Sequence, residues 1–505
     1  MSKIIVVGAG IAGLTAAIKA SESGVPVNLI SPDFSERSQS VMAMGGINAS
    51  LNTKGENDSV KQHFEDTMNS GCWINDENAV WKLTSNAPKI ISWLERLGTS
   101  FTRDEKGNVD LRYFGGQKKQ RTAYAGARTG KQIVTSLVNE CRKKEAEGHV
   151  KRFTPFRFVS LIFTDEKECC GVNCINENTG EIKSFTGDAV ILATGGFNNL
   201  FGRTSGSIHN DGYATAKAFT QGVELANLEM IQYHPTTVKT PVKRMLITEA
   251  ARGEGGKLFI LKDGKPWYFM KEWYPEQAEL MPRDVVSRSI YKASDAGRKE
   301  VYLDITHLDE KTIKEKLDEV YDVCMTYLNL NPIEEPIPIY PGIHYFMGGI
   351  RTDENHKTNI NGLYAAGECS CQYHGANRLG GNSLLGAIHG GCIAAENAIL
   401  ENPQGKIISD IVSPDRYEDN RTADIMNKSM GIYRSEDELN NALMELDKIN
   451  EDNALILLAR ACIISALERK ESRGAHQRID YPQSNEEFKK STCVRYDGRI
   501  RVSFK

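Results

Sequence analysis

The chain has 505 residues, of which 40% are hydrophobic and 25% are charged, the composition of an ordinary globular protein. Its formal net charge of −4 gives no electrostatic reason to expect a nucleic-acid partner. No stretch approaches the ~20 apolar residues that a membrane-spanning helix needs. The N-terminal "MSKIIVVGAG" enters a buried strand at once, so we expect a cytoplasmic protein without a signal peptide.

The cysteines do not follow a ligand pattern. There are eleven, with irregular spacings such as Cys169, Cys170 and Cys174, and no pair has the CxxC spacing. Zinc ribbons and cysteine-held iron–sulfur clusters are therefore not expected, and no acidic cluster indicates another metal. Reduced cysteines in a cytoplasmic protein are the simpler interpretation.

The first thirty residues have the pattern of a dinucleotide-binding unit. A β-branched run, "KIIVV", precedes Gly8, Gly10 and Gly13, and a helical pattern and a second strand at 26–31 follow. Gly8 suits a tight turn, Gly10 the approach of a pyrophosphate to the backbone, and Gly13 helix-on-strand packing. The second strand ends in Ser31 rather than in the acidic residue that holds a ribose, which weakens a specific prediction of a nicotinamide nucleotide.

Two later segments repeat the strand-then-glycine pattern. They are "DAVILATGG" at 188–196 and "NGLYAAGE" at 361–368, where Glu368 could take the ribose role that Ser31 cannot. Strands so far apart in one nucleotide-binding sheet imply an insertion, which we place at about 231–340. After about 408, Leu439, Leu443 and Leu446 recur at helical spacing, and the segment around Asp497-Gly498 predicts a hairpin.

Several segments carry groups suited to gripping a small dianion. Taken singly, each has a simple structural explanation: Glu249 can pair with Arg252 at i, i+3, and Arg288 with Asp284. Taken together, arginines, histidines and a threonine beside glycine-rich or prolyl turns suit charge-assisted bonds to carboxylates. The chain has no GxSxG motif, which would instead indicate a nucleophilic serine. The residues are His234, Thr248, Glu249, Arg252, Arg283, Arg288, His344 and Arg378.

Longer strings give a specific resemblance. "HGANRLGGNSLL" after "LYAAGE", "TEAARGEGG" before "PRDVVSRS", "ESRGAHQR" at 471–478 and "YFGGQKKQRTAYAGARTG" at 113–130 resemble the flavoprotein subunit of succinate dehydrogenase and fumarate reductase. The match runs in register from residue 4 to about 482. It implies FAD, and an α/β fold: a Rossmann-like FAD-binding domain, an inserted α+β capping domain and a C-terminal helical domain. The expected boundaries are 1–230 and 341–407 for the FAD-binding domain, 231–340 for the cap, and 408–505 for the helical domain with its terminal hairpin.

The resemblance also implies roles for individual residues. The dicarboxylate site falls on Phe114, His234, Thr248, His344 and Arg378, the proton donor on Arg283, and the relay that resupplies its proton on Glu249 and Arg252. The FAD positions are Gly8, Gly10, Gly13, Ser31, Ser38, Gln39, Ser40, Met44, Gly45, Gly46, Gly195, Asp211, Glu368, Asn382, Ser383 and Leu384. The implied activity is that of an FAD-dependent oxidoreductase acting on CH–CH groups, in which flavin N5 gives hydride to fumarate and Arg283 gives the proton.

One position departs from the family. Its usual Arg-Ser-His-Thr or Arg-Ser-His-Ser carries the histidine that attaches FAD covalently, whereas this chain reads Arg37-Ser38-Gln39-Ser40. We therefore expect non-covalent FAD. Because the histidyl link raises the flavin potential, its loss favours fumarate reduction over succinate oxidation, as in the electron transport of anaerobic respiration.

Alternatives stay open at this point. L-aspartate oxidase shares the fold and untethered FAD, but that family has Met-Ala-Ser where this chain has Leu379-Gly380-Gly381. A reductase of another unsaturated acid, or a flavin-holding subunit without substrate chemistry, are the others. With no haem CxxCH and no cluster motif, electrons must come from a partner, and the family implies an iron–sulfur subunit. That complex is either soluble, with thiols as its electron source, or peripheral at the inner face of a membrane, and this chain has no span of its own.

Overall fold

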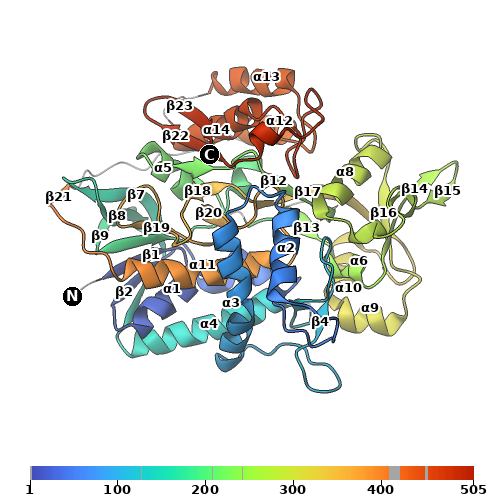
Figure 1. The fold of residues 1–505 in the computed structure, drawn as a ribbon, viewed down its shortest axis with the longest axis horizontal. Coiled ribbons are helices and arrows are strands. Elements are labelled where there is room, and N and C mark those ends of the chain that lie inside the picture. Colours follow the sequence, from blue (N-terminus) through green and yellow to red (C-terminus); the bar gives the residue numbers. More distant parts are fainter. Residues whose placement is uncertain (1–2, 127, 208, 241–242, 409–420, 450–452) are drawn as a thin grey trace.

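The computed structural model describes residues 3–126, 128–207, 209–240, 243–408, 421–449 and 453–505 (Figure 1). At its centre lies a five-stranded sheet with the order β19-β10-β1-β2-β6. Its pairings are all parallel, so the predicted strands near residues 190 and 363 do join the N-terminal strand in one sheet. The strands are β1 Ile4–Val7, β2 Val27–Ile30, β6 Val150–Phe153, β10 Ala189–Leu192 and β19 Leu363–Ala365.

The two faces of this sheet have different covers. Ile4 and Val6 of β1 belong to a hydrophobic cluster with the helices, whereas Ile5 and Val7 belong to a second cluster with an antiparallel sheet. Alternate residues of a strand point to opposite faces, and a sheet covered on both faces needs an apolar run such as "IIVV". The helices are α1 Ile11–Glu22, α2 Val60–Ser70, α3 Glu77–Arg96, α4 Thr129–Ala146 and α11 Asn382–Ala398. The antiparallel sheet consists of β7 Phe156–Thr164, β8 Cys169–Asn176, β9 Ile182–Thr186 and β21 Ile407–Ile408.

The turn between β1 and α1 needs its glycines. Gly8 has a φ of +106°, a region that side chains disfavour. A Cβ on Gly13 would lie 1.8 Å from the Gly8 carbonyl oxygen, so α1 packs directly on the end of β1. Gly10 caps the helix, and the Ile11 N–H donates to Ser40 Oγ at 3.2 Å. The turn therefore brings the segment around Ser40 against the start of α1.

The inserted segment forms a sheet of its own, at the right of Figure 1, with the order β13-β12-β17-β16-β14-β15. It has a separate hydrophobic core that includes Leu258, Phe269 and Ile290. The domain boundaries at 230 and 340 stay a prediction; β12 begins at Ile231, and β17 runs across residue 340. The strands are β12 Ile231–Lys239, β13 Arg244–Leu246, β14 Lys257–Lys262, β15 Lys265–Trp267, β16 Val301–Asp304 and β17 Ile337–Phe346. The helices are α6 Ala250–Gly253, α7 Phe269–Trp273, α8 Arg283–Ala293, α9 Glu310–Lys316 and α10 Asp318–Val323.

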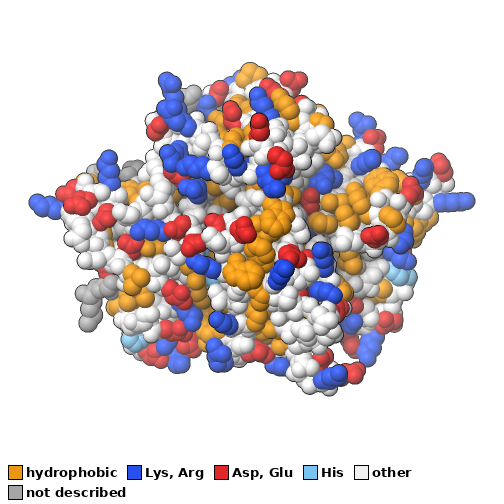
Figure 2. Space-filling model, in the orientation of Figure 1, with side chains coloured by type: hydrophobic (Ala, Val, Ile, Leu, Met, Phe, Trp, Pro, Cys, Tyr) orange, Lys and Arg blue, Asp and Glu red, His pale blue; other side chains and the backbone are white. Residues whose placement is uncertain are grey.

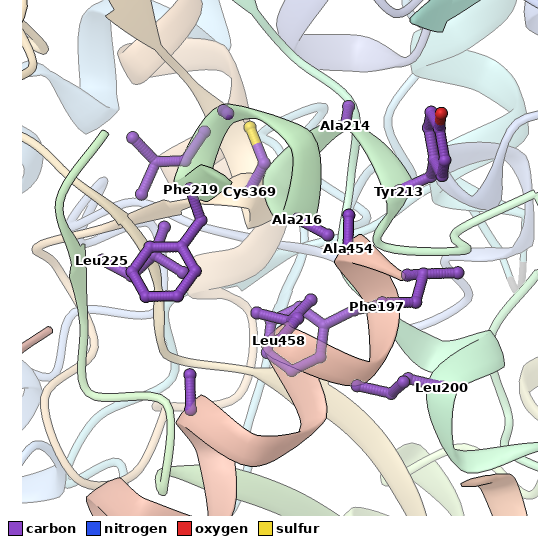
Figure 3. Packing of buried hydrophobic residues seen from close by; sticks show 14 of the residues in the cluster. Phe197, Leu200, Tyr213, Ala214, Ala216, Phe219, Leu225, Cys369, Ala454 and Leu458 are labelled. Atoms are coloured by element: carbon purple, nitrogen blue, oxygen red, sulfur yellow. The ribbon is translucent and has the colours of Figure 1, made fainter. Parts of the chain in front are cut away.

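The C-terminal part lies at the top of Figure 1 and continues the core of the central sheet. Figure 3 shows Leu458 of α14 beside Phe197, and Ala454 near Ala216 of α5, all in one buried cluster. The predicted helix that contains Leu439 and the predicted terminal hairpin are both present. The helices of this part are α12 Arg421–Ser429, α13 Glu436–Leu446 and α14 Ala454–Glu468, and the cluster also includes residues of α5 Tyr213–Thr220, which precedes the insert. The hairpin, β22 Thr492–Tyr496 and β23 Ile500–Phe504, pairs with β11 Leu225–Ala226 in a sheet that also holds β18 Gly349–Arg351 and β20 Ser370–Cys371.

A small sheet and several single turns of helix complete the fold. The sheet consists of β3 Ile47–Asn48, β4 Leu111–Arg112 and β5 Thr122–Ala123 in the order β3-β5-β4. It joins the end of the 38–46 segment to the segment that carries Phe114. The single turns are η1 Ser35–Arg37, η2 Gln39–Met42, η3 Asn198–Phe201, η4 Ala278–Leu280, η5 Cys324–Leu328, η6 Gly367–Cys369 and η7 Glu486–Phe488.

The cysteines, the helices and the surface agree with a globular protein. All eleven cysteines are free. In the part of the chain that the structure describes, no helix is both long and apolar enough to cross a bilayer. Figure 2 shows positive and negative side chains interspersed over the face that it draws.

A buried ion network fixes the chain after α14 and generates a stability prediction. Arg469 donates to Glu229 Oε1 at 2.7 Å and to Glu471 Oε1 at 2.9 Å, and all three side chains are 0% exposed. Arg469→Met should lower the free energy of unfolding by about 3–5 kcal/mol, because it leaves the buried Glu229 carboxylate without its ion-pair partner, whereas Glu471 keeps Arg473. Chemical denaturation measures the loss. Arg298→Met, which breaks an exposed pair with Asp295, is the control and should cost at most about 1 kcal/mol; equal losses in the two variants would contradict the prediction.

Candidate active site

One large cavity, of about 330 Å³, collects most of the predicted site residues. It lies at the carboxyl ends of β1 and β10, where parallel sheets bind their ligands, and the insert closes its other side. Of the residues predicted from sequence, the structure places these on its walls: Gly8, Gly10, Ser31, Ser38, Gln39, Ser40, Met44, Gly45, Gly46, Phe114, Gly195, Asp211, His234, Thr248, Glu249, Arg283, His344, Glu368, Arg378, Ser383 and Leu384.

Four predicted residues do not line the cavity: Gly13, Arg252, Asn382 and Arg288. Gly13 is behind the turn, where it supports the packing of α1 on β1. Arg252 lies behind Glu249, which lines the cavity, and its guanidinium donates a hydrogen bond to the Glu249 carboxylate. The side chain of Asn382 turns away: it donates to Thr67 Oγ1 at 3.0 Å and accepts from Asn48 Nδ2 at 2.8 Å, so a contact of Asn382 with FAD stays a prediction.

The 38–46 segment presents polar atoms that lack partners. Ser38 Oγ and Gln39 Oε1 are buried without a hydrogen bond, and Thr194 Oγ1 on the same cavity is in the same state. Buried polar groups almost always have partners, so these three atoms indicate a polar ligand. Gly45 has no room for a side chain, because a Cβ there would lie 2.7 Å from the Phe114 ring.

The far end of the cavity holds the predicted carboxylate-binding groups. His234 comes from β12 and His344 from the antiparallel neighbour β17, and their ring centroids are 5.2 Å apart. Thr236 contacts His234 Nδ1 and Ser205 Oγ lies 2.8 Å from His344 Nδ1, whereas His234 Nε2 is buried without a partner.

Burial and neighbouring cations set the charges at this end. Burial, Arg283 and other neighbours hold the pKa of His234 and of His344 well below the ordinary value, so both rings are neutral at physiological pH. Burial and Arg283 also lower the pKa of Arg378 to about 9, which leaves it charged. Its guanidinium lies 4.3 Å from the centroid of the Tyr345 ring, and its Nε has no partner.

A chain of three buried ionic groups ends on the same cavity. Arg283, the first residue of α8, donates to Glu249 Oε2 from Nε at 2.8 Å and from Nη2 at 2.6 Å. Glu249 Oε1 accepts from Arg252 Nη2 at 3.1 Å and from the Gly115 N–H at 3.0 Å. Burial pushes the pKa of Glu249 upward, but the two guanidinium groups outweigh it and hold the pKa below its ordinary value. Arg288, by contrast, pairs with Asp284 at 2.8 Å and does not line the cavity.

Two contacts at the site were missed from sequence. Gln232 Oε1 accepts from Arg283 Nη1 at 3.1 Å, and Gln232 Nε2 donates to the Arg378 carbonyl oxygen at 2.8 Å. Its i, i+2 spacing from His234 in a strand was a signal that could have found it, because such residues share a face. Tyr345 also lines the cavity, and nothing in the local pattern around it distinguishes it from a core aromatic.

Two acidic residues line the end of the cavity nearer the glycine turn. Glu368 Oε1 accepts from the Phe346 N–H at 3.1 Å, and burial raises its pKa to about 7. Asp211 Oδ1 accepts from the Tyr213 N–H at 2.9 Å, and burial raises its pKa as well. Among the described residues, no group of three or more His, Cys, Asp or Glu side chains could hold a metal ion. The cavity thus combines a glycine turn, buried hydroxyl groups without partners and two carboxylates. This combination fits a dinucleotide such as FAD.

The raised pKa of Glu368 predicts a pH-dependent stability in the ligand-free protein. Between the ordinary glutamate pKa and about 7 the folded state binds more protons than the unfolded state, so stability falls as pH rises through this window. Glu368→Gln should therefore raise the melting temperature at pH 8 and have a smaller effect at pH 5. The exposed Glu105→Gln, as control, should shift melting equally at both values. A gain from Glu368→Gln that is the same at pH 5 and pH 8 would show the prediction to be wrong.

Comparisons with known proteins agree with the geometry. The model described as "FAD binding domain" matches residues 3–384, and "Fumarate reductase flavoprotein C-term" matches residues 453–505. The chain is 38% identical to the succinate dehydrogenase flavoprotein subunit of Bacillus subtilis, over 98% of this chain and 94% of that one. It is 34% identical to the fumarate reductase flavoprotein subunit of Mycobacterium tuberculosis, over 99% of this chain and 96% of that one.

A solved structure matches over the full length. The FrdA chain of Escherichia coli quinol fumarate reductase superposes with a TM-score of 0.90 at 30% identity, covering 100% of this chain and 96% of that one. The arrangement of flavin domain, insert and C-terminal part is thus shared. The chain belongs to the FAD-dependent oxidoreductase family of succinate dehydrogenase and fumarate reductase flavoprotein subunits.

Proposed function

We propose that this chain reduces fumarate to succinate, with non-covalent FAD and with Arg283 as the proton donor. One observation carries the proposal: a single cavity holds both the end of the buried chain Arg283–Glu249–Arg252 and the unpartnered nitrogens of His234 and Arg378. A substrate with two carboxylates and one reducible bond between them matches this combination of donors.

The substrate's carboxylates would be held by unlike groups. Arg378 offers a charged guanidinium fixed by Tyr345, whereas His234 offers a neutral ring whose Nε2 is unpartnered. Thr248 and His344 line the same end of the cavity. Phe114 lies against Gly45, between this end and residues 38–46, which we call the flavin segment. Hydrogen bonds that are fixed before binding orient the alkene and cost no reorganisation during the reaction.

Arg283 would supply the proton as negative charge develops on the alkene carbon. A guanidinium is normally never deprotonated, so the transfer must be concerted with that developing charge. Glu249 grips two nitrogens of Arg283 and is itself held by Arg252, which gives a continuous path along which the proton is replaced. Gln232 binds the third guanidinium nitrogen and fixes its direction. Burial keeps water from competing, since Arg283 is 5% exposed.

FAD, when bound, supplies the hydride. The residues that would hold it are the glycine turn at Gly8 and Gly10, Ser31, the 38–46 segment, Glu368 and the N-terminus of α11. Gln39 has no nucleophilic ring nitrogen for a covalent link, and its buried, unpartnered Oε1 fits a hydrogen bond to the cofactor. Without the histidyl link the reduced flavin is the stronger reductant, so the fumarate-reducing direction is favoured.

A side chain at Gly380 would not fit this site. A Cβ there would lie 2.8 Å from Glu249 Oε2 and 3.0 Å from Phe114, and a Cβ on Gly381 would lie 2.1 Å from Asn48 Oδ1. The Met-Ala-Ser form of L-aspartate oxidase would place side chains at both positions. This supports fumarate over aspartate as substrate. Formation of hydrogen peroxide from aspartate would show that the protein is an L-aspartate oxidase. Faster turnover of another unsaturated acid than of fumarate would show that this other acid is the substrate.

The electrons would arrive from a partner with an iron–sulfur cluster. A solved relative, Sdh1 of Mycobacterium smegmatis, is described as a complex, and it matches over 100% of this chain with a TM-score of 0.84 at 29% identity. We propose a cytoplasmic protein, held peripherally at the inner face of the membrane where its partners anchor it.

Removing the proposed acid tests the function. Arg283→Gln should lower the rate of fumarate reduction with reduced viologen by about 10²–10⁴-fold, the usual contribution of a positioned proton donor. FAD content, measured by absorbance, should stay unchanged. Lys292→Gln, on the exposed part of the same helix, is the control. Turnover that survives the loss of Arg283 with little change would rule out the assigned role.

The mode of FAD attachment has a direct test. Acid precipitation of the purified yellow protein should release all of the FAD into the supernatant, because Gln39 cannot form the histidyl bond. The absorbance of supernatant and redissolved pellet measures the division. Flavin-free protein mixed with FAD immediately before precipitation controls for trapping. A pellet that keeps its colour after washing would show a covalent bond.

A further inference from the structure

Arg112 lies directly behind the flavin segment. It is the last residue of β4 and is 8% exposed. Its Nε donates to the Gly45 carbonyl oxygen at 3.2 Å, and Nη2 donates to the carbonyl oxygens of Gly45 and Met44. Met44 and Gly45 line the main cavity, so Arg112 holds the backbone of the segment from the side opposite the proposed flavin.

The charge on Arg112 is not neutralised by a direct partner. Within the described ranges, no carboxylate forms an ion pair with its guanidinium, which instead lies 4.2 Å from the centroid of the Tyr124 ring and 5.7 Å from that of Phe114. Burial lowers its pKa to about 10, so it remains a cation at neutral pH. A buried cation bonded only to carbonyls and rings is an uncommon arrangement.

A second cavity, of about 220 Å³, opens behind Arg112. It separates the small β3-β5-β4 sheet from the insert, and its other charged residues are paired: Lys54 with Asp110, and Lys316 with Glu254 at 3.1 Å. Among the described residues that line this cavity, Arg112 is therefore the charged one without an ion-pair partner.

We propose that Arg112 sets the reduction potential of the bound flavin. Reduction places additional negative charge on the ring system, and a fixed cation across one layer of backbone stabilises that charge. Its bonds to Gly45 and Met44 also polarise the peptide groups that face the cofactor. The role is one of positioning and electrostatics, since the side chain does not enter the main cavity. It partly offsets the lower potential expected from the absence of a histidyl link.

This inference rests on the proposed placement of FAD along residues 38–46, and its test uses no fumarate. The potential of the bound flavin is measured by anaerobic dye-linked titration of the loaded protein. Arg112→Gln keeps a hydrogen-bond donor but removes the positive charge. Arg112→Lys keeps the positive charge but removes the planar guanidinium that donates from two nitrogens. We expect Arg112→Gln to lower the potential by at least ~30 mV, tenfold in the equilibrium constant of the two-electron couple. Arg112→Lys should shift it by less, and Lys292→Gln should not shift it.

Equal shifts of the potential in the glutamine and lysine variants would overturn the proposal, because they would show that the shape of the side chain matters and its charge does not. No shift in either variant would overturn it as well. If Arg112→Gln fails to retain FAD, Glu254→Gln replaces it. That variant removes a negative charge from the second cavity and should raise the potential; an unchanged or lowered value would overturn the proposal. A protein that holds FAD and shows these shifts but does not reduce fumarate would refute the proposed reaction and leave this inference standing.

Discussion

The structure depends on one carboxylate held between two guanidinium groups. Glu249 is 1% exposed, and without Arg283 and Arg252 its burial as an anion would be prohibitively costly. The two arginines come from the insert, α8 and α6, while the groups that face them, Phe114 and Arg378, come from segments that belong to the flavin side. The proposed acid, Arg283, therefore faces groups that only the contact between the insert and the flavin side brings to the same cavity.

Charge balance supports the proposal that the cavity binds an anion. Arg283 and Arg378 face it as cations while Glu249 is shared between two arginines, and the histidines are kept neutral by burial and by those same cations. In the proposed reaction a dianion would supply the charge that the cavity lacks, and the neutral histidines would donate hydrogen bonds without adding positive charge. Such an asymmetric set of donors would polarise the proposed substrate along its length.

Much of this could be predicted from sequence, because the informative residues carry local signals. The glycine turn, the strands at 188–196 and 361–368 and the terminal hairpin follow from apolar runs and turn residues. The resemblance in sequence motifs identified most of the residues that the structure brings to one cavity. Tyr345 and Arg112 were missed because their contacts join distant segments, whereas Gln232 was missed although its i, i+2 spacing from His234 was a local signal. The direction of the Asn382 side chain could not be predicted for the same reason: its neighbours Asn48 and Thr67 come from segments more than three hundred residues away.

The central claim is that reduced flavin in this cavity passes its electrons to fumarate. A single-turnover experiment tests it most directly: anaerobically reduced protein is mixed with fumarate in a stopped-flow instrument, and flavin absorbance and succinate are followed together. The account predicts one succinate for each flavin reoxidised, faster than succinate reduces the oxidised protein. Flavin that stays reduced with fumarate but reoxidises promptly with oxygen would contradict it.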